Sequence, residues 1–472
     1  VGSEMCIRDR YREALEAIIK AVDIDNAKAV FHYSLGLVFE KLDRNIFAID
    51  EYQKAIFIDG EQINACNNLG NIFLKIGAFA EAEAIYRHAI KVTPNYFANY
   101  LNLGNLLMIN QRINEAINTY QKALECNYSY PDIYHNLAIA FTAKNDPNQS
   151  CLYYGYSLYW QHKYTEAIQR LEEYLLTNIP KDITVYIRLG YCYKKIDQYE
   201  SAIKIYQKGI GIYPDAENLY LNLVRTLRDA GRIREAIALV EEAVTQLGKS
   251  LLLEFQKELI LPILYETETE IAFYRTRFEK GLNNLINTTS LQTDEDKHNA
   301  LIGISQTAVF YLGYQGKNDL ELKKKYGHFV SKIMAANYPE WAQNLPMPAP
   351  NKDTKIRIGY MSDYFRNHSG AKWAIGWIKY LHRENFEIYC YYTASESDSI
   401  TQEFQQLSDY FHHIVLTKKL ENTHQEIAKV CQQIIADKLH ILVFTDLALY
   451  SMQYIGAPYV WSFQPMGANI SI

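Results

Sequence analysis

Apolar and small residues recur along the first half of the chain at a fixed spacing. A leucine followed by a small residue returns every 34 positions, is interrupted once, and then resumes the same spacing. The pairs are Leu35-Gly36, Leu69-Gly70, Leu103-Gly104, Leu137-Ala138, Leu189-Gly190 and Leu223-Val224. A period of about 20 to 50 residues indicates stacked structural repeats, because one such unit cannot cover its own apolar face.

A second set of positions in each unit predicts a pair of antiparallel helices. Alanines lie twelve residues after the small residue of the pair, and tyrosine rings lie four residues further on, which is helical spacing. The alanines are Ala48, Ala82, Ala116, Ala202 and Ala236, and the tyrosines are Tyr52, Tyr86, Tyr120 and Tyr206. We expect each ring to fill the seam of the next hairpin. This arrangement of small and large residues is that of the tetratricopeptide repeat.

The repeat positions divide the region 11–250 into units. Six full repeats are expected at 29–62, 63–96, 97–130, 148–182, 183–216 and 217–250. Residues 11–26 are predicted to be the second helix of a preceding repeat, and residues 131–145 a first helix that lacks its partner. Residues 1–10 resemble a translated sequencing-adapter scar, and we expect them to lie outside the fold.

Stacking of the repeats leaves one polar stripe unexplained. The residue before the repeat leucine is rotated by about 100° from it around the helix, and it is often asparagine. With two further asparagines three residues on, the stripe contains Asn68, Asn71, Asn102, Asn105, Asn136 and Asn222. A primary amide both donates and accepts, so a ladder of amides can hold an extended peptide backbone on the concave face. A row of solvated polar positions explains the same residues equally well.

The repeat spacing ends near residue 251, although helical patterning continues. Residues 283–290 and 294–296 are predicted to be loops, and the Pro-rich stretch 346–350 excludes a helix. We therefore expect 251–350 to be a helical transition region that ends in a linker.

Strands and helices alternate in the C-terminal part, 351–472. Strands are predicted at 355–361, 386–392 and 440–444, and helices at 371–381 and 425–436. Such alternation predicts a mainly parallel, doubly wound sheet, whose ligands bind beyond the carboxyl ends of the strands. Two polar groups lie at that edge, namely the loop 363–370 after the first strand and Asp446 after the last.

Composition and charge narrow the class of protein. The chain has 472 residues and a net charge of −6, so it has no positive surplus for neutralising nucleic-acid phosphates. Its seven cysteines are widely spaced without a C-x-x-C pair, which indicates neither a disulfide framework nor a zinc site. No stretch approaches the roughly 20 apolar residues of a membrane span. We expect a cytoplasmic protein that binds no nucleic acid, no membrane and no metal.

Several motifs taken together resemble one family. The segment 357–362 leads into Asn367-His368-Ser369, and the segments 386–391 and 440–443 follow in the same order as in that family. With tetratricopeptide repeats upstream, the chain after residue 10 resembles the protein O-linked N-acetylglucosamine transferase (O-GlcNAc transferase) and SPINDLY family. The segment 251–350 is most similar to bacterial SPINDLY-type members, notably at 335–339.

The resemblance implies an activity and a fold. The family transfers a sugar from a nucleotide donor, UDP-GlcNAc or GDP-fucose, to Ser or Thr of acceptor proteins, with inversion and without an obligatory metal. Its GT-B fold consists of two Rossmann-like halves, and this chain would carry the first of them, incomplete. The asparagine stripe would then hold the acceptor peptide.

The resemblance also suggests catalytic residues. His368 matches the family's Asn-His loop, and an imidazole suits proton transfer or orientation of the acceptor; a loop histidine that caps the next helix is the structural alternative. Asp446 lies where the family carries a different polar active-site residue. Ser369 and Lys372 open a helix whose N-terminus favours anions, although a solvated helix end is the simpler interpretation of both.

We expect the chain to be a fragment of a longer protein. Most donor contacts of the family come from the second half, which this sequence lacks, and the residues after about 448 depart from the family's pattern. The 472-residue chain is therefore expected to be inactive by itself. Two alternatives remain open, a non-catalytic protein-interaction scaffold and an enzyme with another substrate, since a fold alone does not assign chemistry.

Overall fold

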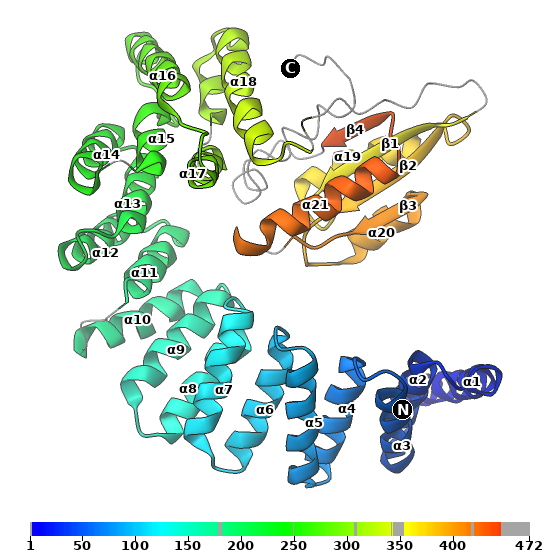
Figure 1. The fold of residues 1–472 in the computed structure, drawn as a ribbon. Coiled ribbons are helices and arrows are strands. Elements are labelled where there is room, and N and C mark those ends of the chain that lie inside the picture. Colours follow the sequence, from blue (N-terminus) through cyan, green and yellow to red (C-terminus); the bar gives the residue numbers. More distant parts are fainter. Residues whose placement is uncertain are drawn as a thin grey trace. The chain divides into compact units, whose positions relative to one another are not determined.

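The structure, a computed structural model, describes residues 2–177, 182–248, 250–305, 309–340, 342, 354–416 and 420–444. The chain divides into two compact units, Val1–Ile212 and Tyr213–Ile472. The described elements of the first unit are all helices, and the second unit contains helices followed by a parallel sheet (Figure 1). No helix of the described residues is both long and apolar enough to cross a bilayer.

The first unit is a row of helical hairpins. Helices α2 and α3, α4 and α5, α6 and α7, and α11 and α12 pack in pairs that coincide with the predicted repeats. The helices are α1 (Gly2–Ile24), α2 (Ala29–Lys41), α3 (Asn45–Ile58), α4 (Ile63–Lys75), α5 (Phe79–Val92), α6 (Phe97–Ile109), α7 (Ile113–Cys126), α8 (Pro131–Ala143), α9 (Pro147–Trp160), α10 (Tyr164–Thr177), α11 (Thr184–Lys195) and α12 (Tyr199–Ile212). The backbone of α1 is helical from Gly2, so it includes most of the segment that was expected to lie outside the fold.

The predicted small and large positions meet inside each repeat. The ring of Tyr52 on α3 packs against Gly36 on α2, and Tyr86 on α5 packs against Gly70 on α4 in the same way. All four seam tyrosines are buried. The expectation that each ring fills the seam of the next hairpin is confirmed in part. Tyr52 shares a core cluster with Leu69 of the next repeat, but the glycine on which it lies belongs to the first helix of its own repeat. Without a Cβ atom, this glycine lets the large ring lie directly on the helix backbone.

The sequence suggested that residues 131–145 form a helix without a partner, and this prediction is wrong for α8. It packs against α9, and α9 also packs against α10. On the α8 side, Tyr153 stacks on Phe141 with ring centroids 5.2 Å apart. On the α10 side, Gly155 lies against the side chain of Leu171. Helix α9 is therefore shared between two neighbours, and this sharing accounts for the break in the 34-residue spacing.

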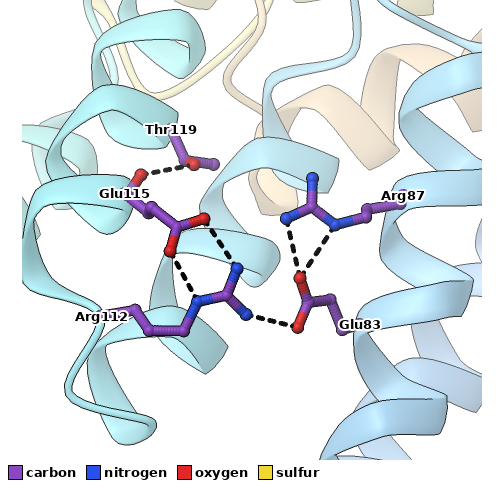
Figure 2. A network of polar contacts seen from close by, with 5 residues as sticks. All are labelled: Glu83, Arg87, Arg112, Glu115 and Thr119. Atoms are coloured by element: carbon purple, nitrogen blue, oxygen red, sulfur yellow. Dashed lines mark hydrogen bonds and ion pairs between the residues drawn. The ribbon is translucent and has the colours of Figure 1, made fainter.

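A network of charged side chains joins two successive repeats (Figure 2). Arg112, in the turn before α7, donates from Nη1 to Oε2 of Glu83 on α5 over 2.7 Å. The same guanidinium donates from Nε and Nη2 to the two carboxylate oxygens of Glu115, each over 2.7 Å. Arg87 donates to the other oxygen of Glu83. Glu83 thus lies between two guanidinium groups and links α5 to the next hairpin.

Before the sheet, the helices of the second unit start with a packed pair that coincides with the predicted repeat 217–250, and they then continue beyond the repeats. They are α13 (Glu217–Asp229), α14 (Ile233–Leu247), α15 (Leu251–Leu259), α16 (Glu268–Thr288), α17 (Asp294–Ser305), the 3₁₀ helix η1 (Phe310–Gln315) and α18 (Leu320–Asn337). The loops predicted at 283–290 and 294–296 are wrong for most of their residues, because 283–288 complete α16 and Asp294 begins α17. Acidic residues in a first helical turn interact favourably with the helix dipole, and this explains why an acidic cluster opens α17.

The four described strands of the second unit pair in parallel, in agreement with the predicted mainly parallel sheet. Its strands are β1 (Ile356–Ser362), β2 (Phe386–Tyr392), β3 (Tyr410–His413) and β4 (Ile441–Phe444), in the order β3-β2-β1-β4. The register pairs Ile356 with Phe386, Tyr389 with Tyr410, and Ile358 with Ile441. This is the strand order with which a doubly wound nucleotide-binding sheet begins, and the order reverses between β1 and β4.

Helices cover both faces of this sheet. Helices α19 (Ser369–Tyr380) and α20 (Ser399–Leu407) pack on the face that carries Ile358, Tyr360 and Ile388. Helix α21 (Leu420–Ala436) packs on the opposite face, which carries Tyr389 and Tyr391. Alternate strand residues therefore enter two separate cores, as the pleat of a strand requires. The sequence predicted α19 and α21 but not α20 or β3.

Candidate functional site

The predicted asparagine stripe lies on the first helices of the repeats. Asn68 and Asn71 belong to α4, Asn102 and Asn105 to α6, and Asn136 to α8. Asn71 is exposed and the other four are partly buried. These side chains are therefore accessible, although none of them is simply solvated, because each makes a hydrogen bond within the protein.

Seam tyrosines orient part of this stripe. The hydroxyl of Tyr120 donates to Oδ1 of Asn105 over 2.7 Å, and Nδ2 of Asn136 donates to the same oxygen over 2.8 Å. The hydroxyl of Tyr86 donates to Oδ1 of Asn71 over 2.6 Å. Burial raises the pKa of both phenols, so each remains a neutral donor. The tyrosines that fill the seams thus also position the amides.

Two further bonds extend this network toward the N-terminus. Nδ2 of Asn68 donates to the hydroxyl of Tyr52 over 3.2 Å. Nδ2 of Asn102 donates over 3.1 Å to Oδ1 of Asn67, a buried residue that sequence reasoning missed. Asn222, in the second unit, donates instead to the carbonyl of Asn218 on its own helix over 2.7 Å. The structure therefore brings the stripe residues of the first unit into hydrogen-bonded contacts, and Asn222 makes no such contact among the described residues.

Each amide of the first unit keeps one group for another molecule. The NH₂ groups of Asn71 and Asn105 have no protein partner among the described residues, and neither do the amide oxygens of Asn68, Asn102 and Asn136. Donors and acceptors therefore both remain available along the stripe. An extended polypeptide backbone presents the complementary carbonyl and N–H groups.

A second group of polar residues lies at the carboxyl edge of the sheet, after β1 and β2. The backbone N–H of Tyr364 donates to Oγ of Ser362 over 2.9 Å, which turns the chain at the end of β1. The ring of Tyr364 stacks on the imidazole of His368, with ring centroids 4.1 Å apart. His368 is thus held at the predicted place, in the loop that leads into α19.

The loop after β1 is bound to the loop after β2. Arg366 forms an ion pair with Glu396. One oxygen of Asp398 accepts the backbone N–H of Asn367 over 2.6 Å, and the other caps α20. The N–H groups of Asn367, Thr401 and Ile400 hold the pKa of Asp398 below its usual value. This carboxylate therefore fixes the segment that carries His368.

Two buried donors at this edge have no partner among the described residues, Nε of Arg366 and Oγ1 of Thr393. Such groups mark a place where a polar ligand would replace lost hydrogen bonds. Sequence reasoning missed Thr393, although its position directly after the predicted strand 386–392 was a usable signal. Lys372 is exposed on α19, and the backbone of Ser369 begins this helix. Asp446 lies outside the described residues.

The described part of the chain contains no group of three or more His, Cys, Asp or Glu side chains that could hold a metal ion.

Sequence comparisons assign both parts of the chain to known types. Residues 63–96, 104–145 and 197–252 match sequence models of the tetratricopeptide repeat. Residues 324–450 match the sequence model of glycosyl transferase family 41. These matches confirm the predicted fold class, a solenoid of tetratricopeptide repeats followed by part of a glycosyltransferase fold. No curated protein matches the chain.

Several solved structures are similar to parts of this chain. A mutant of the Thermobaculum terrenum O-GlcNAc transferase is 17% identical with a TM-score of 0.37, and the match covers 68% of this chain and 49% of that protein. This chain thus spans about half the length of that transferase. MamA is 19% identical with a TM-score of 0.32, over 35% of this chain and 97% of MamA. YrrB, a TPR protein with an unusual peptide-binding site, is 18% identical with a TM-score of 0.26, over 43% of this chain and 96% of YrrB.

Proposed function

We propose that this chain belongs to a nucleotide-sugar-dependent protein O-glycosyltransferase. In this proposal the repeats bind the acceptor polypeptide, and the sheet supplies one half of the transfer site. The observation that carries the proposal is the match of residues 324–450, which include the whole parallel sheet, to a glycosyl transferase family in a chain that also has tetratricopeptide repeats. The acceptor proteins and a cytoplasmic location are part of the proposal.

The repeats would hold the acceptor through its backbone. The amides of Asn68, Asn71, Asn102, Asn105 and Asn136 are pre-oriented by hydrogen bonds inside the protein and keep one group each for a ligand. Preorganised polar groups lose little conformational freedom on binding, so they favour affinity. Because backbone groups are common to all sequences, this contact would accept many proteins. Asn222 is retained as a candidate of the same register, although its amide donates to its own helix instead of to a neighbouring repeat.

The edge of the sheet would carry the chemistry. Inverting transfer requires a group that takes or relays the proton of the acceptor hydroxyl while the nucleoside diphosphate departs from UDP-GlcNAc or GDP-fucose. His368 is our candidate for this role or for orienting the acceptor, since its loop is fixed through Asp398 and its ring through Tyr364. Nε of Arg366 and Oγ1 of Thr393 would donate to the oxygens of a ligand. We retain Asp446 as a second polar candidate.

A two-part experiment tests this function. Binding of UDP-GlcNAc and GDP-fucose to the chain is measured by saturation-transfer NMR, with wild-type protein and with His368→Ala and Arg366→Gln variants. Binding of fluorescent, extended Ser/Thr peptides is measured by anisotropy, with an Asn105→Ala/Asn136→Ala variant. We expect one donor to bind and both sets of substitutions to weaken their respective ligand.

The two parts separate the proposal from its alternatives. Peptide binding without any nucleotide-sugar binding would favour a protein-interaction scaffold. Nucleotide-sugar binding without peptide binding would favour an enzyme with another acceptor. Intact mass spectrometry of the peptide measures sugar transfer directly. Transfer by the 472-residue chain would contradict our expectation that it is inactive by itself.

A further inference from the structure

One position of the asparagine stripe carries a charged residue. The residue before the repeat leucine is asparagine at 68, 102, 136 and 222, but in the repeat 183–216 it is Arg188, which precedes Leu189 on α11. A guanidinium therefore takes the place of an amide in the same register of the repeat. The amides of the first unit suit any polypeptide backbone, whereas the guanidinium of Arg188 favours a negatively charged group.

Four aromatic rings surround this guanidinium, and we name them the aromatic surround of Arg188. Its central carbon lies 3.9 Å from the ring centroid of Tyr156, 5.3 Å from that of Tyr134, and 5.6 Å from those of Tyr159 and Trp160. Tyr134 comes from α8 and the other three rings come from α9. Cation–π contacts at these distances hold the cation without neutralising its charge.

The hydrogen-bonding capacity of Arg188 is largely unused. Nη2 donates to the hydroxyl of Tyr134 over 3.3 Å, whereas Nη1 is buried and has no partner among the described residues. Nε1 of Trp160, in the same surround, is likewise buried and without a partner there. A buried donor that lacks an acceptor is costly, and more so when it is charged. Two such donors in one cluster point to an acceptor that a ligand supplies.

Three other arginines of the first unit have an acidic partner within the chain. Arg87 pairs with Glu83, Arg112 with Glu83 and Glu115, and Arg170 with Glu173. No carboxylate lies within ion-pair distance of Arg188 among the residues that the structure describes. The charge of Arg188 is therefore available to a bound molecule.

We propose that Arg188 and its aromatic surround bind a carboxylate of the polypeptide held by the asparagine stripe, so that the repeats prefer acidic segments. The inference rests on the proposed function of the repeats as a polypeptide-binding surface, which it deepens by naming a substrate preference. A carboxylate has two coplanar oxygens that accept from a guanidinium fork in parallel. Arginine, tyrosine and tryptophan are also the residue types that dominate binding energy at protein interfaces.

The rings differ in how readily they can make room for the ligand. Tyr134 and Tyr156 are buried, with 4% and 6% of their surface exposed, and form the fixed base of the site. Tyr159 and Trp160 are partly exposed. Entry of a carboxylate would shift these outer rings and bring its oxygens to Nη1 of Arg188 and Nε1 of Trp160. Trp160 is one of the five tryptophans of the chain, so a fluorescence change that Arg188→Gln abolishes reports on this step.

The test uses the full chain and four fluorescent peptides of equal length. Three are amidated at the C-terminus and carry Glu, Gln or Lys at the central position, and the fourth carries Gln and ends in a free carboxylate. Anisotropy gives the dissociation constant of each peptide. We expect the Glu peptide to bind about tenfold more tightly than the Gln peptide, and the Lys peptide to bind most weakly. An advantage confined to the fourth peptide would assign the site to a C-terminal carboxylate instead of a side chain.

Variants connect the preference to Arg188. Arg188→Gln should reduce the ratio of the Gln to the Glu dissociation constant to about one, and Arg188→Lys should leave part of it, since lysine keeps the charge but not the planar fork. Arg87→Gln, at an arginine already paired with Glu83, should leave the ratio unchanged. The Glu peptide should alter Trp fluorescence in the wild-type chain but not in Arg188→Gln. Unchanged affinity for the Gln peptide shows that the variants are folded.

Two results would overturn the inference, and they differ in what else they contradict. The proposed carboxylate site is contradicted if wild type and Arg188→Gln bind peptides with the same preference for Glu. It is also contradicted if wild type binds peptides without any preference for Glu. Both results leave the polypeptide-binding surface itself intact. Absence of binding for every peptide contradicts the polypeptide-binding surface and this inference together.

Discussion

Cε1 of Tyr52 lies 2.6 Å from the place that a Cβ atom on Gly36 would occupy. The hydroxyl of the same ring donates to Glu40 over 2.7 Å and accepts from Asn68 of the next repeat. The ring is therefore fixed at both ends, and it cannot move away from a methyl group on α2 without breaking these bonds. The contact makes the two residues one packing unit of the repeat.

The first prediction follows from this contact. Gly36→Ala should destabilise the first unit by about 1–3 kcal/mol, the usual cost of forcing extra volume into a packed core. Gly211→Ala is the matched control, because a Cβ atom added to this residue of α12 would have no neighbour within 4 Å. It should be neutral or stabilise by up to about 1 kcal/mol through helix propensity. Urea unfolding followed by circular dichroism measures both. Equal midpoints for the two variants would contradict the prediction.

The second prediction concerns the charged network between repeats. Burial tends to raise the pKa of Glu83, but hydrogen bonds from Arg87 and Arg112 outweigh it, so the pKa is lowered. The carboxylate therefore stabilises the fold above the pKa of an unfolded glutamate, and this contribution is lost as the pH falls through the lower folded value. Glu83→Gln should lower Tm by about 1–3 °C at pH 7.

The pH dependence and a control make this prediction specific. The Tm difference between wild type and Glu83→Gln should shrink as the pH falls below the pKa of an unfolded glutamate and through the lower pKa of the folded Glu83 carboxylate. Glu125→Gln replaces an exposed carboxylate on α7 and should leave Tm nearly unchanged. Differential scanning calorimetry at several pH values gives these differences. A gap between wild type and Glu83→Gln that is constant with pH would argue against the ion pairs.

The third prediction concerns the tyrosine that orients the stripe. Tyr120→Phe removes the bond to Oδ1 of Asn105 but leaves the ring in the seam. We expect the affinity for an extended peptide to fall about two- to tenfold, which corresponds to one neutral hydrogen bond. In Tyr100→Phe the lost bond goes to the carbonyl of Pro94, outside the stripe, so affinity should not change. Fluorescence anisotropy compares the two, and equal effects would refute an orienting role.

The fourth prediction concerns the loop that carries His368. Asp398→Ala removes the acceptor of the Asn367 N–H and should speed hydrogen exchange at that amide about tenfold, because this N–H loses its hydrogen bond. Glu403→Ala changes a partly exposed residue of the same helix and leaves the bond from Asn367 to Asp398 intact, so the rate should not change. In wild type, exchange should also accelerate, relative to a control amide, once the pH falls below the lowered pKa of Asp398. Unchanged protection at Asn367 in Asp398→Ala would contradict the coupling.

Much of the fold could be predicted from the sequence because its signals are periodic. The 34-residue spacing predicts helix pairs that agree closely with the structure, for instance 63–96 with α4 and α5. The sequence spacing does not decide which glycine the ring of Tyr52 contacts. The packing places the ring on Gly36 of its own repeat while it also lines a core cluster with Leu69 of the next, so the prediction captured only one side of this seam.

Short elements without an apolar pattern could not be found in the same way. Strand β3 has four residues, and both its ends are exposed, so it shows no buried run. Helix α20 did carry a local signal, the capping box of Asp398 and Thr401, although no apolar pattern accompanied it. At the candidate sites the asparagines were predicted by register. Their tyrosine partners were not, because Asn105 and Tyr120 lie on different helices of the hairpin.

The shared position of α9 limits how this array can change in length. A repeat whose helices contact each other and only the edges of their neighbours can be duplicated or deleted as one genetic block. Helix α9 packs against α8 on one side and against α10 on the other. Deleting the residues on either side of α9 would therefore leave a helix whose apolar surface is exposed to solvent. Insertions and losses of whole repeats should therefore be found in related sequences before α8 or after α10, and not between them.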